Sequence, residues 1–140
     1  MRVFVIIFCC FFYSCLLWAE LPNGNATIAG DISISSDTQI MTIDQQSDQA
    51  IIEWNSFNIG ENNTVNFQQP SSSASVLNRV ISGNPTTLAG SLNAIGKVFV
   101  VNENGVYFTP TSTINAHSFA ASTLALSNDN FLNNKFLFKA

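Results

Sequence analysis

The sequence is poor in charge, and positive charge is the scarcest. Its 140 residues contain 9 Asp and Glu but only 5 Lys and Arg, which gives a formal net charge of −4 with the single histidine neutral. Apart from Arg2, the basic residues are scattered along the chain at Arg79, Lys97, Lys135 and Lys139. Binding to a phosphate backbone needs a cluster of basic groups, so this distribution argues against a nucleic-acid partner.

Cysteine is confined to the start of the chain. The run Val3–Trp18, in which 15 of 16 residues are apolar or aromatic, contains all three: Cys9, Cys10 and Cys15. A basic residue precedes this run, and the small residue Ala19 separates it from polar sequence. This pattern is typical of a secretory signal peptide, so we expect residues 1–19 to be removed and residues 20–140 to form the mature domain.

Two other interpretations of the apolar run stay open. One is a permanent membrane anchor, although its 16 residues are short for a spanning helix of about 20. The other is a lipid attached to Cys15, although Phe12 and Tyr13 suit such a signal poorly. If the run is a cleaved signal, the mature chain has no cysteine, which excludes a disulfide scaffold and a thiolate–zinc site.

Residues suited to catalysis are also rare. His117 is the only histidine and has no acidic neighbour in sequence, so we expect a surface position for it. We interpret Asp44 and Asp48 as part of a solvated loop and not as a metal site. Ser56 lacks the Gly-x-Ser-x-Gly motif of hydrolases, and the sequence has no glycine-rich phosphate loop. We therefore expect no enzyme activity, no metal, no cofactor and no small-molecule substrate.

The chain is rich in small polar residues. Residues 20–140 contain 17 Asn, 15 Ser and 10 Thr. Disordered chains combine such polarity with high charge and few apolar residues, whereas Ile, Val and Phe recur throughout this one. The mixture favours β-structure with many hydrogen-bonded turns.

The apolar residues occur in short bursts, not in helical stripes. Ile32-Ser33-Ile34 and Val65-Asn66-Phe67 alternate strictly, as expected for strands with one face inward. Turn residues separate the bursts roughly every 8–12 residues, which indicates an all-β protein. We expect one helical turn within Pro85–Ala94, where Leu88 and Leu92 are four residues apart.

A sandwich, a barrel and a parallel β-helix all fit this pattern, and two features favour the β-helix. Only Asn104-Gly105 supplies the two-residue turn that joins antiparallel neighbours. Asparagine is also abundant near strand ends, where stacked coils can align its amides in ladders. The sequence shows no clean repeat of about 20 residues, so periodicity alone does not establish a solenoid.

Seven segments together carry a resemblance to a known family. They are Ile52–Gly60, Val65–Pro70, Leu77–Val80, Gly90–Phe99, Asn102–Phe108, Ala121–Leu124 and Asn130–Leu132. In this order and spacing they resemble the N-terminal secretion domain, or haemagglutination activity domain, of filamentous-haemagglutinin-like exoproteins of the two-partner secretion type. Leu21–Gly24 and Ala29-Gly30 also match the family's start after its signal peptide, so the resemblance covers nearly all of residues 20–140.

The resemblance implies a fold. Members form a right-handed parallel β-helix, a pectin lyase-like single-stranded solenoid, with an N-terminal cap. They normally continue into a longer secretion domain and then a very long repetitive β-helix, whereas this sequence stops at Ala140. We therefore interpret residues 20–140 as an incomplete member with a truncated C-terminal end.

The resemblance also implies a function and a partner. After crossing the inner membrane, the chain is expected to be captured by a cognate outer-membrane β-barrel transporter with periplasmic domains, and to fold outside. It would then be secreted, or lie on the surface of a Gram-negative-type bacterium, as part of an adhesin-type exoprotein. The loop residues Asn102, Asn104 and Gly105 are expected to serve recognition or folding. The other matching motif residues are Trp54, Phe57, Asn58, Gly60, Asn78, Arg79 and Gly96.

Two residues depart from the family pattern. Glu103 stands where the usual Asn-Pro-Asn-Gly loop has proline, so the loop loses a fixed φ and gains a charge. Ile95 stands where the family has Asn, so a polar loop side chain has become apolar. Either change is expected to weaken recognition by the transporter while leaving the fold intact.

Two other functions stay open. The first is an adhesin fragment that binds host cells or glycans directly, with Trp54 and Phe57 as a carbohydrate platform. Because Ile51 and Ile52 are adjacent, we favour packing at the end of the β-helix for Trp54. The second, more distant alternative is a β-helical carbohydrate-active enzyme, although the clustered carboxylates that such a site needs are lacking.

Overall fold

The computed structural model describes residues 20–140, so the expected signal peptide lies outside the described residues. The strands are β1 (Ala26–Ala29), β2 (Ile32–Ser36), β3 (Ile40–Gln45), β4 (Gln49–Trp54), β5 (Thr64–Gln68), β6 (Ser75–Val80), β7 (Thr86–Leu88), β8 (Ser91–Ala94), β9 (Lys97–Val101), β10 (Val106–Phe108), β11 (Thr113–Asn115) and β12 (Ser118–Ser122). A short helix, α2 (Asn128–Leu132), follows them. None of the helices described here is long and apolar enough to cross a membrane.

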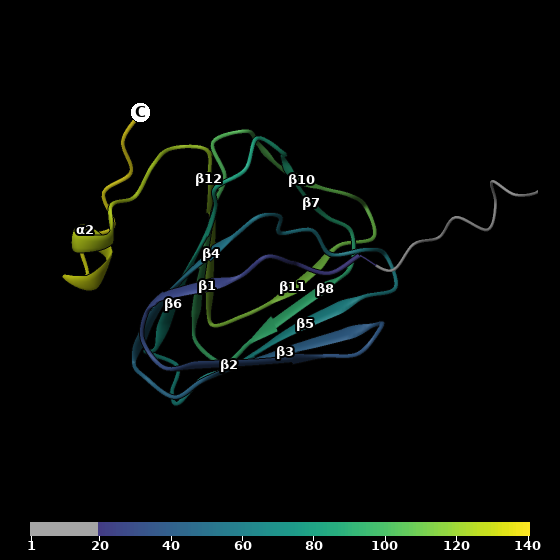
Figure 1. Cartoon of the computed structure of the whole chain (residues 1–140), viewed down its shortest axis with the longest axis horizontal. Coiled ribbons are helices and arrows are strands. Elements are labelled where there is room, and N and C mark those ends of the chain that lie inside the picture. The colour runs from purple at the N-terminus through teal and green to yellow at the C-terminus, as the bar shows by residue number, and fades with distance from the viewer. Residues whose placement is uncertain (1–19) are drawn as a thin grey trace, which may run out of the picture.

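The strands form three sheets that wrap around a common interior (Figure 1). Their strand orders are β1-β4-β6-β9-β12, β11-β8-β5-β3-β2 and β10-β7. From β3 onward every pair is parallel and joins a strand to its counterpart one coil later. The domain is therefore a β-solenoid of about 4 turns, and the predicted parallel β-helix architecture is confirmed.

The coils differ in length, which hides the repeat in the sequence. One row of stacked positions contains Met41, Val65, Leu92 and Ile114. The separations between these residues show that successive coils are 24, 27 and 22 residues long. The differences arise in the corner loops, because the strands that stack keep a continuous register. The sequence therefore has no single fixed period, although the strands of successive coils stack in register.

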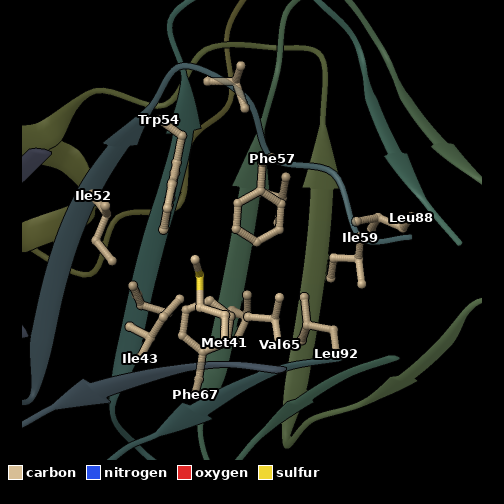
Figure 2. Close-up of a cluster of buried hydrophobic side chains, with 14 of the residues drawn as sticks. Met41, Ile43, Ile52, Trp54, Phe57, Ile59, Val65, Phe67, Leu88 and Leu92 are labelled. Carbon is tan, nitrogen blue, oxygen red and sulfur yellow. The ribbon is translucent and has the colours of Figure 1, made fainter. Parts of the chain in front are cut away.

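Alternate side chains of each strand fill the interior (Figure 2). None of the following is more than 5 % exposed: Met41, Ile43, Ile52, Trp54, Val65 and Phe67. Fully burying one such side chain stabilises the fold by about 1.5–3 kcal/mol. The strict alternation seen in Val65-Asn66-Phe67 follows, because Asn66 points outward between two interior residues.

The sheet built from β4, β6 and β9 is buried on its outer side as well. Ile51, Leu77 and Phe99 form a second apolar cluster there, completed by Leu126 and Phe131 from the C-terminal segment. Figure 1 shows this segment, with α2, beside the solenoid. Because both faces of the sheet are covered, consecutive residues of these strands are apolar and buried, as in Val98–Val101.

At the N-terminal end the strand direction reverses. β1 pairs antiparallel with β4, and β2 pairs antiparallel with β3, so each occupies the edge of a five-stranded sheet. A register shift between Thr27 and Ala29 disrupts β1. A bulged antiparallel strand is a poor template for further pairing, so these elements form the N-terminal cap that was expected. At the other end β10, β11 and β12 have a strand on one side only within residues 20–140.

One local prediction was wrong. Pro85–Ala94 holds no helical turn, since it contains β7 and β8 on two different sheets. Leu88 and Leu92 are both fully buried because the chain turns a corner between them, and Gly90 allows that turn: a Cβ there would lie 2.1 Å from the carbonyl oxygen of Gly60. The Asn104-Gly105 turn joins no antiparallel hairpin, because β9 and β10 belong to different sheets.

Candidate functional site

The loop that follows β9 is a tight β-turn formed by residues 102–105. The backbone nitrogen of Gly105 donates to the carbonyl oxygen of Asn102 at 3.0 Å. The Asn102 Oδ1 atom accepts the backbone N–H of Asn104 at 2.9 Å, which reinforces the turn. Among described non-glycine residues only Asn134 has a positive φ, so Asn104 has the negative φ of a type I turn and not the positive φ of type II.

Asn102 fixes this turn to the coil before it. Its side chain is fully buried, and Nδ2 donates to the carbonyl oxygen of Asn84 and to Oγ1 of Thr86, both at 2.9 Å. Its backbone nitrogen donates to the carbonyl oxygen of Ser122 in the next coil. A buried amide with all its polar atoms paired is a strong positional constraint, so Asn102 joins three coils at one corner.

Gly105 is required at the end of the turn. Its φ is +120°, a conformation that residues with a Cβ rarely adopt, and an added Cβ would lie 2.8 Å from Cε2 of Tyr107. Its carbonyl oxygen accepts the backbone N–H of Thr86 at 3.0 Å, which starts the β7–β10 pairing. Glycine thus serves both the turn geometry and the contact with the preceding coil.

The outward side of the turn faces solvent. Glu103 and Asn104 are exposed, and Asn104 Nδ2 donates to the carbonyl oxygen of Ser82 at 3.0 Å. Both residues line an open groove of about 340 Å³ together with Arg79, Val80, Ile81, Ser82 and Val101. The turn therefore has a buried half, Asn102 and Gly105, and an accessible half, Glu103 and Asn104.

Trp54, Asn78 and Phe57 lie together in the interior. The Nε1 atom of Trp54 donates to Oδ1 of Asn78 at 3.0 Å, and Asn78 Nδ2 donates to the carbonyl oxygen of Phe99 at 3.2 Å. Phe57 packs edge-to-face on Trp54 with ring centroids 5.5 Å apart (Figure 2). All three motif residues are fully buried, so the aromatic pair is part of the core and not a surface platform, and Trp54 lies on β4, the strand that pairs with the cap strand β1.

Asn58 and Gly60 belong to the loop that forms the third side of the first coil. The Oδ1 atom of Asn58 accepts the backbone N–H of Thr87 in the second coil at 2.7 Å. A Cβ on Gly60 would lie 2.5 Å from Oδ1 of Asn63, so only glycine leaves room for that buried amide. Both residues therefore act in contacts between elements.

Arg79 joins the solenoid to its C-terminal segment. It pairs in register with Glu53, and Nη1 lies 3.5 Å from Oε2 of that residue in a partly exposed ion pair, which contributes little to stability. Its Nη2 donates to the carbonyl oxygen of Leu126 at 2.7 Å. The guanidinium thus positions the segment that covers the outer apolar cluster.

Gly96 lies at a corner where backbones approach closely. Its nitrogen donates to Oε1 of Gln69 at 2.7 Å, and a Cβ on it would lie 2.4 Å from the carbonyl oxygen of Ala74. Gln69 in turn donates to Oε1 of Gln45 at 3.2 Å, forming a buried glutamine stack. Sequence analysis missed Gln45, Gln69 and Asn63, because a buried amide looks the same in sequence as an exposed one.

An amide ladder occurs on the outer face of the sheet, on β5, β8 and β11. Asn66, Asn93 and Asn115 occupy one row on adjacent strands, and Asn93 Nδ2 donates to Oδ1 of Asn66 at 3.0 Å. Equivalent amides thus stack from coil to coil, as expected for a solenoid.

The residues considered for chemistry are not brought together. His117 is exposed at the corner before β12. Asp48 lies in a loop as expected, but Asp44 belongs to β3, where its Oδ1 accepts Nε2 of Gln46. Over residues 20–140, no group of three or more His, Cys, Asp or Glu side chains is placed to hold a metal ion.

The described residues thus define a capped β-solenoid in which motif residues connect successive coils. The family model described as the TPS secretion domain matches residues 19–139, and this chain belongs to that family. The crystal structure of the HMW1 secretion domain from Haemophilus influenzae superposes with a TM-score of 0.77 and 35% identity, over 81% of this chain and 30% of that one.

Two relatives from Haemophilus influenzae are called heme/hemopexin-binding proteins. One, from strain Rd, is 39% identical over 121 residues, which are 84% of this chain and 13% of the relative. The other is 42% identical over 105 residues, 74% of this chain and 11% of the relative. The chain thus spans only a small part of the length of the relatives it matches.

Proposed function

We propose that residues 20–140 direct the export of the polypeptide that carries them through a cognate outer-membrane β-barrel transporter. The observation that carries this proposal is membership of the TPS secretion domain family over residues 19–139. The apolar segment before residue 20 would first send the chain across the inner membrane as a cleaved signal. The domain would then be exported to the surface or the medium by a Gram-negative bacterium.

The order of contacts along the solenoid supports this route. Each strand from β5 onward, except β7, finds its parallel partner in the coil made just before it, and β7 meets that coil through the parallel bridge between Ile59 and Leu88. Stability of such a fold is approximately a sum of neighbour terms, so coils can add one at a time as a chain emerges from a pore. Residues 20–140 also contain no cysteine, so no disulfide formed in the periplasm would block threading.

Recognition would take place on the extended chain, before it folds. Periplasmic domains of a transporter can pair an extended strand with a sheet edge, which needs no folded ligand. In the folded domain Asn102 and Gly105 contact the preceding coil, whereas Asn104 faces solvent and is less constrained by the fold. We assign recognition to Asn104, which keeps the family residue, and folding to Asn102 and Gly105.

No catalytic role is part of this proposal. The aromatic platform considered for glycan binding is also not available, because Trp54 and Phe57 are fully buried.

Binding to the transporter tests the proposal. The chain, diluted from urea, is passed over the immobilised periplasmic domains of a cognate outer-membrane transporter. We expect the freshly diluted chain to bind and Asn104→Lys to bind more weakly, with Asn62→Lys, in another exposed loop, as the matched control. Equal binding to the periplasmic domain of an unrelated barrel would contradict the proposal.

A further inference from the structure

The first residues of the described chain complete the cap. β1 caps one five-stranded sheet and β2 caps the other, and residues 20–24 run antiparallel along the loop after β4, on the third side. Asn23 donates its backbone N–H to the carbonyl oxygen of Ser56 at 3.0 Å, and Asn55 donates to that of Asn23 at 3.0 Å. Leu21 packs on the interior cluster and Pro22 is buried. Each side of the first coil is thus covered by its own antiparallel segment.

Glu20 is held at three points by the loop of the first coil. Its backbone nitrogen donates to Oδ1 of Asn63 at 3.0 Å, and its carbonyl oxygen accepts the N–H of Gly60 at 2.8 Å. Its carboxylate oxygen Oε2 accepts Nδ2 of Asn58 at 2.9 Å. Asn63 is only 3% exposed, so the nitrogen of Glu20 meets a fixed acceptor and not a mobile surface side chain.

The two amides that hold Glu20 also bind other elements. Asn63 Nδ2 donates to the carbonyl oxygens of Thr38 and Gln39, at 3.1 and 3.2 Å, in the turn between β2 and β3. Asn58 accepts the backbone N–H of Thr87 in the second coil. Through these side chains, Glu20 ties the start of the domain to the cap hairpin and to two coils.

We propose that Ala19–Glu20 is the bond cut when the leader is removed, and that the amino group so created is a built part of the cap. Hydrolysis adds one water across the peptide bond: Ala19 takes the new carboxylate, and the Glu20 nitrogen, protonated, becomes an ammonium. That nitrogen is the atom that donates to Asn63. A charged donor forms a hydrogen bond roughly twice as strong as a neutral amide does.

Leader removal would therefore strengthen the cap once the chain has folded outside the cell, whereas a chain that keeps its leader has only a neutral amide at this position. A cut after Glu20 would remove all three contacts, which favours Ala19–Glu20 over sites further into the domain. This inference rests on the proposed export only for its biological role, since the effect on stability needs no transporter.

Refolded chains of defined amino terminus test the inference. We compare residues 20–140 with a free amino group, the same chain Nα-acetylated to imitate the precursor, and a chain that begins at Leu21. At pH 6 we expect acetylation to lower the thermal midpoint by about 3 °C, and removal of Glu20 to lower it further. When both chains carry Asn63→Ala, the free and acetylated forms should have equal thermal midpoints. When both carry Asn62→Ala, at the exposed neighbouring residue, the difference between the two forms should remain.

Equal midpoints for the free and acetylated wild-type chains would overturn the role of the ammonium. Because that comparison uses the wild-type sequence, it stays informative if Asn63→Ala fails to fold. N-terminal sequencing of exported protein should return Glu20, and a start at Leu21 or beyond would overturn the assigned bond. Export that fails altogether would count against the proposed function and would leave the stability comparison intact.

Discussion

At the scale of single residues, the family motifs of this chain are mostly connections between coils. Asn78 and Asn102 are both fully buried, and each bonds atoms contributed by two other coils. A buried amide that loses its partners costs about 1–3 kcal/mol, so such residues are strongly constrained by folding alone. We assign recognition to the exposed neighbour Asn104.

Gly105→Ala is expected to destabilise the domain far more than Glu103→Pro. The φ of +120° at Gly105 and the nearby Tyr107 ring give an expected cost of about 2–3 kcal/mol. Proline at 103 takes the second position of a type I turn, which it favours, and the Glu103 backbone N–H makes no hydrogen bond among the described residues. Thermal midpoints of refolded protein measure both effects, and equal midpoints for wild type and Gly105→Ala would make the turn a passive surface feature.

Asn102→Ala is expected to lower the free energy of unfolding by about 2–4 kcal/mol. The change leaves the Asn84 carbonyl, the Thr86 hydroxyl and the Asn104 N–H without their partner. Asn104→Ala is the matched control, because removal of this exposed side chain should lower the free energy of unfolding by less than about 1 kcal/mol. Urea denaturation of both variants checks the difference, and similar costs would remove the distinction between the two halves of the turn.

Asp37 gives the cap a pH dependence. Its Oδ1 atom accepts the backbone N–H groups of Gln39 and Ile40 at 2.8 Å each, and these bonds lower the pKa of its carboxyl. A lowered pKa means that the stabilisation is present at neutral pH and is lost as pH falls through the folded-state value. We expect Asp37→Asn to reduce the loss of thermal midpoint between pH 5 and about pH 3. An unchanged acid profile would show that the turn does not depend on this charge.

At the scale of elements, alternation and turn chemistry predicted the strands but not where the chain changes direction. Val65-Asn66-Phe67 alternates because it has one inner face, and that is visible in the sequence. Leu88 and Leu92 looked helical because two corner-separated strands place apolar residues four apart. The coil lengths of 24, 27 and 22 residues are set by loops whose packing depends on the whole fold. Short-range patterns carry no information about such contacts.

The C-terminal segment was only partly predicted. Asn130–Leu132 was placed in the family pattern, but α2 was not expected, and its five residues are too few for a helical stripe. Ser127 caps the helix, since its Oγ accepts the backbone N–H of Asn130. Phe131 is the buried residue of the helix and packs edge-to-face on Phe99, with centroids 5.7 Å apart.

Phe131→Ala is expected to detach this segment from the solenoid. Loss of a fully buried phenylalanine costs about 3–5 kcal/mol, and here it exposes Phe99 and Leu77 beneath it. Leu132→Ala, at the exposed neighbour, is the control and should change little. Hydrogen exchange of the 126–138 amides, together with dye binding to exposed apolar surface, measures detachment. Unchanged protection in Phe131→Ala would contradict the account of this cluster.

At the scale of the whole molecule, the two ends of the solenoid differ. The N-terminal end is closed by antiparallel segments, whereas β10, β11 and β12 are the edge strands at the other end. Residues 104–128, which include these strands, contain no Asp, Glu, Lys or Arg. Natural edge strands are usually protected by charge, so we expect residues 20–140 to self-associate through this end as concentration rises. Sedimentation should show Thr113→Lys and Ser118→Lys reducing association, with Ser71→Lys as a loop control. A chain that stays monomeric at high concentration would show that this end needs no cover.

The central claim is that this domain directs its own export, and the most direct measurement is transporter-dependent secretion. Residues 1–140 are produced in a Gram-negative host with a cognate transporter, with an unrelated barrel, or with neither, and the amount of the chain in the medium is compared with the amount in the periplasm. We expect accumulation outside the cell only with the cognate transporter, with Gly105→Ala reduced. Equal amounts outside the cell in all three strains, or retention in the periplasm with the cognate transporter, would contradict the claim.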